Sequence, residues 1–407
     1  MRTTRFPSRI IALLVVIAGS LLAPVPASAG GITVVENSVE HSFGQQVAFT
    51  LEASSDAKIS QIYLFFHATD DDETEKKEVS LEAHGRQVSV RHVHNARVYP
   101  LPPFATITFW WQIEDVAGNR LETAPKHFKY TDNRFQWRER SAGGITIHWI
   151  DGAGDPAYAQ TALDVAETSV EDINAELRAP LPDPFDIYIY DSAHHLEAAM
   201  MLSGRDWAGG QARPELGVVV VAVPPEEGYV SRMKRYLPHE ITHLLTYQRT
   251  TPEGYEHVPR WLDEGLATAN EQLPTPEYAL VLQESYEANQ LLPLANLCAP
   301  FSPDSQTAAL SYAESASVVR FIREQYGADG IRRLLSSYAD GASCTSGVEE
   351  ALGISFNRLE SAWRAGLRPE ARWRAWVDQV DVWIVMWLLS LLVAVPMIGG
   401  IRRRRAQ

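Results

Sequence analysis

Two histidines four residues apart, with a glutamate directly after the first, are the residues of this chain whose spacing points most clearly to chemistry. Residues 239–243 read His-Glu-Ile-Thr-His. Positions i and i+4 of a helix lie on one face, so the rings of His239 and His243 can reach one metal ion. Glu240 lies one step around the same turn, where its carboxylate can act on a water molecule beside the metal without being a ligand. The spacing therefore predicts a metal-dependent hydrolytic site.

Glu264 is the candidate for the third metal ligand, in the segment Trp-Leu-Asp-Glu-Gly at 261–265. A catalytic zinc site has three protein ligands and one open position. Arg249 stands where a metzincin would carry its third ligand, so that pattern is absent. His257 is another donor, but it directly follows a loop-like run, and we interpret it as a loop residue. Asp263 adjoins Glu264, and neighbours on a helix point about 100° apart, so only one of the two can face the metal.

Both segments are predicted to be helical. An apolar periodic run from Tyr236 to Tyr247 predicts a helix that is buried on one side, which argues against two merely solvated histidines. Within this run, Pro238 must either begin a helical segment or kink one. Gly265 and Ala267 are small, which would let the second helix approach the first one closely.

The two segments together resemble a known family. His-Glu-Ile-Thr-His followed by Trp-Leu-Asp-Glu-Gly-Leu-Ala at 261–267 is similar to the gluzincins of the peptidase MA-like superfamily, which includes thermolysin and the alanyl aminopeptidases. Residues 311–322, Ser-Tyr-Ala-Glu-Ser-Ala-Ser-Val-Val-Arg-Phe-Ile, resemble the helix downstream of the glutamate ligand in the aminopeptidase branch. The resemblance covers roughly residues 140–366. It implies a zinc peptidase with one Zn²⁺ per chain, held by His239, His243 and Glu264, with Glu240 as general base and Tyr312 as oxyanion donor.

The sequence departs from the aminopeptidases at one point. The Gly-x-Met-Glu-Asn segment that grips a free amino terminus is missing, and the corresponding stretch, 207–217, offers only Glu215 before an apolar run. The choice between endopeptidase and exopeptidase therefore stays open. The resemblance further implies that the strand beginning at Val218 edges the cleft and pairs with the substrate backbone.

Residues 1–29 have the composition of a signal peptide. Three arginines lie within the first nine residues, an apolar core runs from Ile10 to Leu22, and Ala27-Ser28-Ala29 offers a cleavage site before Gly30. The core is too short to span a bilayer comfortably, which favours removal over anchoring. We therefore expect the body of the protein to be exported.

An uncharged stretch from Val382 to Ile401 is predicted to be a transmembrane helix. At 1.5 Å per residue it reaches about 30 Å, the thickness of a hydrocarbon core. Four arginines follow at once and would stay in the cytoplasm, in a tail of residues 402–407. The expected location is the cell membrane, crossed once, with the catalytic domain outside the cytoplasm.

The charge of the chain limits its partners. It carries 36 basic and 51 acidic residues, a formal net charge of −15. Seven of the basic residues are arginines of the predicted signal peptide and tail, so the exported body is more acidic still. Such a body repels polyphosphates, which argues against nucleic acid as a partner. A peptide or protein substrate is compatible with it.

Only two cysteines occur, Cys298 and Cys344. An even count in an exported protein is consistent with a disulfide, and the sequence leaves the pairing open. A cysteine nucleophile has no local support, and no Gly-x-Ser-x-Gly motif of a serine hydrolase occurs.

The body is predicted to contain two domains. Residues 30–130 show short alternating strands punctuated by Gly, Asp and Pro, which is typical of an all-β, immunoglobulin-like sandwich. Residues 131–366 alternate strand and helix signals and then turn helical, which fits an α+β zincin-like metallopeptidase domain. A short stalk, 367–381, would join this domain to the membrane helix.

Two other functions stay open from the sequence. A catalytically inactive zincin-fold protein at the cell surface could serve as a binding protein or scaffold, with the β-sandwich holding a protein partner. The intact Glu240 argues against it, because a pseudoenzyme has no need of a base. Hydrolysis of a non-peptide amide or ester would use the same site.

Overall fold

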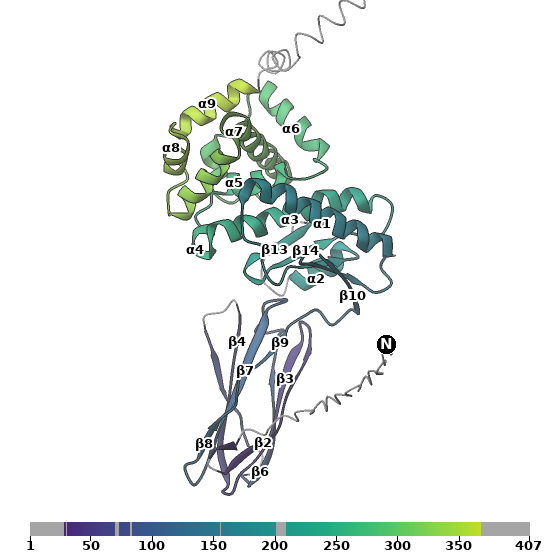
Figure 1. Ribbon diagram of the computed structural model, residues 1–407, viewed down its shortest axis with the longest axis vertical. Helices are drawn as coiled ribbons and strands as arrows, with labels where there is room; N and C mark the ends of the chain where they lie inside the picture. The colour runs from purple at the N-terminus through teal and green to yellow at the C-terminus, as the bar shows by residue number, and fades with distance from the viewer. Residues whose placement is uncertain are drawn as a thin grey trace, which may run out of the picture. The chain divides into compact units, whose positions relative to one another are not determined.

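The computed structural model describes residues 28–29, 31–69, 73–81, 84–154, 156–200 and 209–367 (Figure 1). These residues form two compact units. The first holds the described residues up to Tyr99 together with Thr106–Phe128, and the second holds Pro100–Ala105 and those from Lys129 onward. The predicted transmembrane helix and tail, residues 1–27 of the predicted signal peptide and all but the first residue of the stalk lie outside the described residues. In the described part, no helix is long and apolar enough to span a membrane.

The first unit consists of two antiparallel sheets. One has the strand order β1-β2-β3-β6, and the other has the order β5-β4-β7-β8, with β9 also paired to β7. The ring of Phe49 from the first sheet lies 5.3 Å from that of Phe66 and 5.1 Å from that of Phe109 in the second, so the sheets pack face to face. The strands are β1 (Ser28–Ala29), β2 (Ile32–Ser42), β3 (Gln46–Ser54), β4 (Ile59–Ala68), β5 (Glu75–Glu78), β6 (Gln87–His94), β7 (Thr106–Asp115), β8 (Arg120–Glu122) and β9 (Lys126–Lys129).

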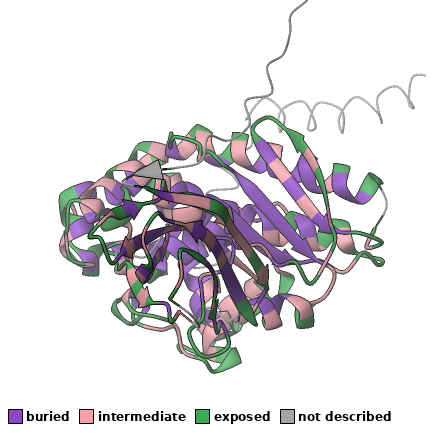
Figure 2. Ribbon diagram, turned by 90° about the horizontal axis from the view of Figure 1, so that it is seen from below, coloured by how far each residue is buried: buried purple, intermediate pink, exposed green. Residues whose placement is uncertain are grey.

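The second unit is built on a mixed sheet with the order β10-β11-β12-β14-β13. The three central strands are parallel, and both edge strands are antiparallel to their neighbours. Every residue of β12 and β14 is buried. Long helices cover one face of the sheet (Figures 1 and 2), and on the other face Tyr188 and Tyr190 of β12 pack against Phe104, Phe135 and Trp137. The strands are β10 (Trp137–Ala142), β11 (Ile145–Ile150), β12 (Asp186–Tyr190), β13 (Gly210–Arg213) and β14 (Val218–Ala222).

Helices make up most of the second unit after the sheet. Helices α1 and α3 lie along the sheet, and the later helices continue beyond α3 (Figure 1). The long helix α7 is interrupted at Gly327, whose φ of 64° is a conformation that favours glycine. The helices are α1 (Pro156–Leu177), α2 (Ala193–Met200), α3 (Tyr229–Thr250), α4 (Pro252–Tyr255), α5 (Arg260–Ala269), α6 (Pro276–Glu287), α7 (Ser305–Ala339), α8 (Ser346–Leu352) and α9 (Phe356–Gly366).

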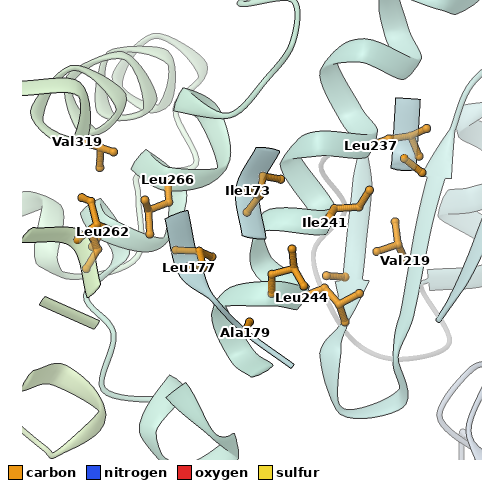
Figure 3. Close-up of a cluster of buried hydrophobic side chains, with 14 of the residues drawn as sticks. Ile173, Leu177, Ala179, Val219, Leu237, Ile241, Leu244, Leu262, Leu266 and Val319 are labelled. Atoms are coloured by element: carbon orange, nitrogen blue, oxygen red, sulfur yellow. The ribbon is translucent and has the colours of Figure 1, made fainter. Parts of the chain in front are cut away.

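Helix α3 is fixed by an apolar stripe. Leu237, Ile241 and Leu244 are fully buried and recur at helical spacing, so they share one face. Figure 3 shows them packed between Ile173 of α1 and Val219 of β14. Burial of each of these side chains is worth about 1.5–3 kcal/mol. The stripe therefore determines which face of α3 is left for His239 and His243.

Helix α5 is also held in place by buried apolar side chains. Leu262 and Leu266 are fully buried and face Val319 of α7 (Figure 3). A Cβ atom on Gly265 would lie 2.6 Å from the carbonyl oxygen of Ser315, also on α7. The prediction that Gly265 serves the approach of α5 to the motif helix was therefore wrong: it allows close contact with α7. No residue larger than glycine fits there without moving one of the two helices.

The coarse fold prediction is confirmed: β-rich sheets come first, and a helical domain follows. The immunoglobulin-like topology and the predicted domain boundaries stay predictions. Helix α3 begins at Tyr229, so Pro238 lies inside the helix and does not begin it.

Cys298 and Cys344 form a disulfide. It joins the end of the short 3₁₀ helix Leu294–Cys298 to the segment between α7 and α8, across a sequence separation of 46 residues. The question that the sequence left open is thereby answered by the geometry, since the two Cα atoms are 6.1 Å apart.

Replacing both cysteines by serine should lower the free energy of unfolding by about 4 kcal/mol, the chain-entropy value for a loop of this length. Urea denaturation of the wild type and of the C298S/C344S variant measures the difference. Wild-type protein kept in reductant is the control and should match the variant. Equal denaturation midpoints in the presence and absence of reductant would contradict the stabilising role.

Candidate metal centre

The metal-binding face of α3 lies opposite its apolar stripe. His239 and His243 have ring centroids 5.1 Å apart, which is the separation expected for neighbours one turn apart. Thr242, between them, is buried and donates its hydroxyl to the carbonyl oxygen of Pro238 at 2.7 Å. Pro238 has no N–H to donate to the carbonyl oxygen of Lys234, four residues earlier, and the backbone N–H of Gln272 donates to that oxygen at 2.9 Å instead.

Helix α5 brings Glu264 to the two histidines. One carboxylate oxygen, Oε2, lies 3.3 Å from Nε2 of His239 and 3.6 Å from Nε2 of His243. The three donor atoms lie within 4.8 Å of one another. The predicted ligand set is therefore brought together by two helices that are separate in the sequence.

These residues fit a divalent metal ion. Neighbouring ligand atoms of a tetrahedral zinc site are about 3.3 Å apart, given bonds of about 2.0–2.1 Å. Glu264 Oε2 is buried and has no hydrogen-bond partner among the described residues. A buried carboxylate oxygen without a donor is costly, and a cation between it and the two ring nitrogens would remove that cost.

The other ring nitrogen of each histidine is held by a second carboxylate. His243 Nδ1 lies 2.9 Å from Asp263 Oδ1, and His239 Nδ1 lies 3.4 Å from Glu271 Oε1. Tyr255 donates its hydroxyl to both oxygens of Asp263 at 3.1 Å. Carboxylates in this position fix the ring orientation and the tautomer, so the lone pair of each Nε2, once that atom has lost its proton, would be directed at a metal ion.

The buried charges perturb one another strongly. Burial alone would lower the pKa of His239, but the nearby carboxylates of Glu264 and Glu271 raise that pKa to about 9. Burial likewise opposes protonation of His243, but the negative charges of Asp263 and Glu264 raise its pKa well above the usual value. Without a metal, both imidazoles are therefore protonated at neutral pH and occupy the place of a cation.

Glu240 points to the edge strand β13. It is buried, and this desolvation raises the pKa of its carboxyl group. The backbone of Ala212 donates a hydrogen bond to it. A Cβ atom on Gly210 would lie 2.8 Å from Glu240 Oε1, so glycine leaves the room that this carboxylate needs.

All five predicted site residues line one cavity of about 260 Å³. Tyr312 is half-buried and enters it from α7, with its ring 6.4 Å from that of His239 and stacked at 6.1 Å against Tyr278. It is thus a residue of the cavity wall and not of the apolar core. The lining residues are Gly210, Gln211, Ala212, Pro214, His239, Glu240, His243, Tyr255, Arg260, Asp263, Glu264 and Tyr312.

Three other interpretations of the sequence are resolved by the structure. The strand beginning at Val218 does not edge the cleft, because β13 covers it and takes the edge position. Glu215 pairs with Arg213 at 2.7 Å and does not line the cavity. His257 is exposed in a turn, as expected, and lies outside the ligand cluster.

Four contributors were missed in the sequence. Glu271 and Tyr255 carry no signal of their own, because each acts through a contact that only folding creates. Arg260 stands four residues before Glu264, and this i, i+4 spacing on a helix could have predicted their contact. Gly210 lies in the stretch that departs from the aminopeptidase pattern, and its short strand was not predicted. Asp263 was considered only as an alternative metal ligand. The 100° step from Glu264 directs its carboxylate instead to Nδ1 of His243, the ring nitrogen other than the one near Glu264.

Metal loading at pH 7 should release about two protons per ion, because both imidazoles must lose a proton before Nε2 can bind. Calorimetry in two buffers of different ionisation enthalpy measures this number. The release should fall as the pH rises through 9, where His239 is already neutral in the metal-free protein. The variant His257→Ala, at the exposed histidine, should behave as wild type, whereas His239→Ala should release fewer protons. Loading without proton release at pH 7 would contradict the assigned ligands.

Comparison with known proteins identifies one family that matches this chain. The family model described as "Peptidase MA superfamily" matches residues 165–369, half of the chain. No curated protein matches. Solved structures match only in part and at low similarity. A structure titled "Myokine structure" is 12% identical, covers 24% of this chain and 93% of its own, and has a TM-score of 0.19.

Two further solved structures match to a similar degree. Wild-type OgpA from Akkermansia muciniphila is 7% identical, with 24% of this chain and 28% of that chain covered and a TM-score of 0.20. The purple acid phosphatase PPD1 from yellow lupin (Lupinus luteus) is 9% identical, with 50% and 40% covered and a TM-score of 0.20. The family match spans α3, α5 and α7, which supply the five predicted site residues. The chain belongs to the peptidase MA superfamily.

Proposed function

We propose that this protein is a zinc peptidase of the gluzincin type, exported and anchored to the membrane. The observation that carries the proposal is Glu264 Oε2, which is buried, has no hydrogen bond from any described residue, and lies 3.3 Å and 3.6 Å from Nε2 of the two histidines in a cavity that Glu240 also lines. Two imidazoles and one carboxylate are the donor set of a catalytic zinc site. Membership of the peptidase MA superfamily supports peptide bonds as the substrate.

The metal would be held by His239, His243 and Glu264. When bound, zinc supplies a Lewis acid that brings the pKa of water to about 7 and polarises a carbonyl group. Asp263 and Glu271 hold the two rings so that Nε2 stays directed at the ion.

Glu240 is the general base of the proposed mechanism. Its carboxylate accepts a proton from the attacking water and later delivers this proton to the leaving amine. Burial raises the pKa of this carboxyl group and so makes the carboxylate a stronger base, which helps the first of these transfers. The hydrogen bond from the backbone of Ala212 and the space left by Gly210 keep the carboxylate in place between the two transfers.

Tyr312 is the proposed donor to the carbonyl oxygen of the scissile bond. Burial raises the pKa of its hydroxyl above the ordinary value, so it stays protonated and can donate at any physiological pH. Its ring is held in the cavity wall between Tyr278 and Phe301, with which it makes stacked and edge-on contacts. A donor held at the position where charge develops stabilises the transition state more than the ground state.

The edge strand β13 suggests how a substrate would lie. Strand β14 uses one side of β13, and the other side of β13 is not paired to any described strand. An extended peptide can add to such an edge through backbone hydrogen bonds. Because Gly210 and Ala212 also contact Glu240, a peptide bound there would pass the base directly.

Export and anchoring rest on segments outside the described residues. The basic and apolar start of the chain, 1–29, supports export, and the uncharged stretch 382–401 with its arginine tail supports a single anchor. A disulfide in the described part agrees with folding outside the cytoplasm.

The variant Glu240→Gln should retain one zinc ion and lose activity, with kcat/KM about a hundredfold to ten-thousandfold lower, because the amide cannot accept the proton. Metal content by atomic absorption and cleavage of a broad peptide library measure the two effects. The control is Glu256→Gln, at an exposed turn residue. Normal peptide cleavage by Glu240→Gln would refute the proposed mechanism. Zinc-loaded wild-type protein that cleaves no peptide would favour the alternative function as a scaffold protein.

Replacing Tyr312 by Phe should lower kcat about a hundredfold to a thousandfold with unchanged zinc content, because only the donor to the oxyanion is lost. Steady-state kinetics measures kcat and KM separately. Tyr278→Phe is the matched control, since it removes a hydroxyl from the ring stacked on Tyr312 but outside the cavity wall. An unchanged kcat in Tyr312→Phe would show that this tyrosine only fills space.

A further inference from the structure

Arg260 contacts the metal cluster at a place that the proposed mechanism does not use. It is the first residue of α5 and reaches one turn along the helix to Glu264. Its side chain keeps 44% of its surface exposed, while the carboxylate of Glu264 keeps only 3%. Among the described residues that line the cavity, Arg260 is the one side chain that is always positively charged.

The two oxygens of Glu264 have different environments because of this arginine. Arg260 Nη2 donates to Oε1 at 2.6 Å, which is the length of a strong charge-assisted hydrogen bond. The other oxygen, Oε2, lies near both Nε2 atoms and accepts no hydrogen bond within the part of the chain that the structure describes. One oxygen is thus occupied by the guanidinium, and the other is left for a metal ion.

Stabilisation of the helix does not explain the position of Arg260. A cation in the first turn is unfavourable to the helix dipole, which prefers anions there. The order Arg-then-Glu at i, i+4 is also the weaker orientation of such a pair, and even the better one is worth only about 0.2–0.5 kcal/mol. The arginine also lies 3.5 Å from Asp263 Oδ2, and Asp263 holds the ring of His243. Its contacts therefore point to the cluster and not to the helix.

We infer that Arg260 is a positioning residue that restricts Glu264 to binding the metal through one oxygen. The inference rests on the proposed function. A carboxylate can bind a metal ion through one or both oxygens, and a second oxygen would take the position that a catalytic site keeps open. By holding Oε1, Arg260 preserves that position. It also offsets part of the negative charge of Asp263, Glu264 and Glu240 around the cavity.

Cobalt(II) in place of zinc tests this, because its visible absorption reports the coordination number. Wild-type protein should bind one cobalt ion per chain with the intense bands of four-coordinate cobalt. In Arg260→Met, the freed Oε1 should join the ion, so the bands should lose intensity per cobalt, and the dissociation constant should rise about tenfold or more. Arg260→Lys keeps the charge and one donor, and it should restore part of the band intensity and of the affinity.

Two comparisons make the outcomes distinct. Arg138→Met removes another arginine–carboxylate pair, with Asp151, far along the chain in β10, and should leave the spectrum and the affinity of wild type unchanged. Identical four-coordinate spectra of wild type, Arg260→Met and Arg260→Lys would overturn the role of Arg260 and leave the metal site intact. Wild-type protein that binds no cobalt would instead refute the proposed function. If Arg260→Met does not fold, Arg260→Ala decides, because it also removes both the charge and the donor, and an unchanged spectrum and affinity there refute the inference.

Discussion

The convergence of Glu264 Oε2 with Nε2 of His239 and His243 is the contact on which the rest of the site depends. It joins α3 to α5, and a shift of either helix by about one ångström would separate the donor atoms beyond the reach of one ion. The helices are held by packing and not by the site itself. Leu237 and Ile241 fix α3 against α1 and β14, and Gly265 allows α5 to lie directly on α7. The apolar core therefore pre-organises a polar cluster that opposes burial.

The cluster concentrates negative charge inside the second unit. Four carboxylates, those of Glu240, Asp263, Glu264 and Glu271, are buried around two imidazoles. Arg260, which contacts Glu264, is always positively charged. Buried charges that lack a partner destabilise a fold, so such an arrangement is retained only where a cation or a proton can enter it. In the metal-free protein, protons on the histidines serve this purpose, which is why the pKa of each imidazole is raised against the effect of burial.

The sheet and the helices contribute different groups to the site. The helices α3, α5 and α7 supply the predicted ligands, the base and Tyr312, whereas the edge strand β13 supplies the backbone beside Glu240. This arrangement places Glu240 between the predicted metal ligands and a strand edge that no described strand pairs with, where an extended chain could be held. The disulfide between Cys298 and Cys344 ties the segment before α7 to the segment after it, so it braces the helix that carries Tyr312.

The sequence alone determined the local chemistry. The i, i+4 spacing of His239 and His243 puts both rings on one face of any helix, and the apolar stripe at 237, 241 and 244 follows from helical periodicity. What lies far apart in the chain was decided by the tertiary structure. The pairing of Glu271 with His239, the approach of Glu264 to both histidines and the edge position of β13 instead of the Val218 strand all depend on how helices and strands pack. Periodicity describes each element by itself, whereas these contacts arise only when buried surfaces of separate elements meet.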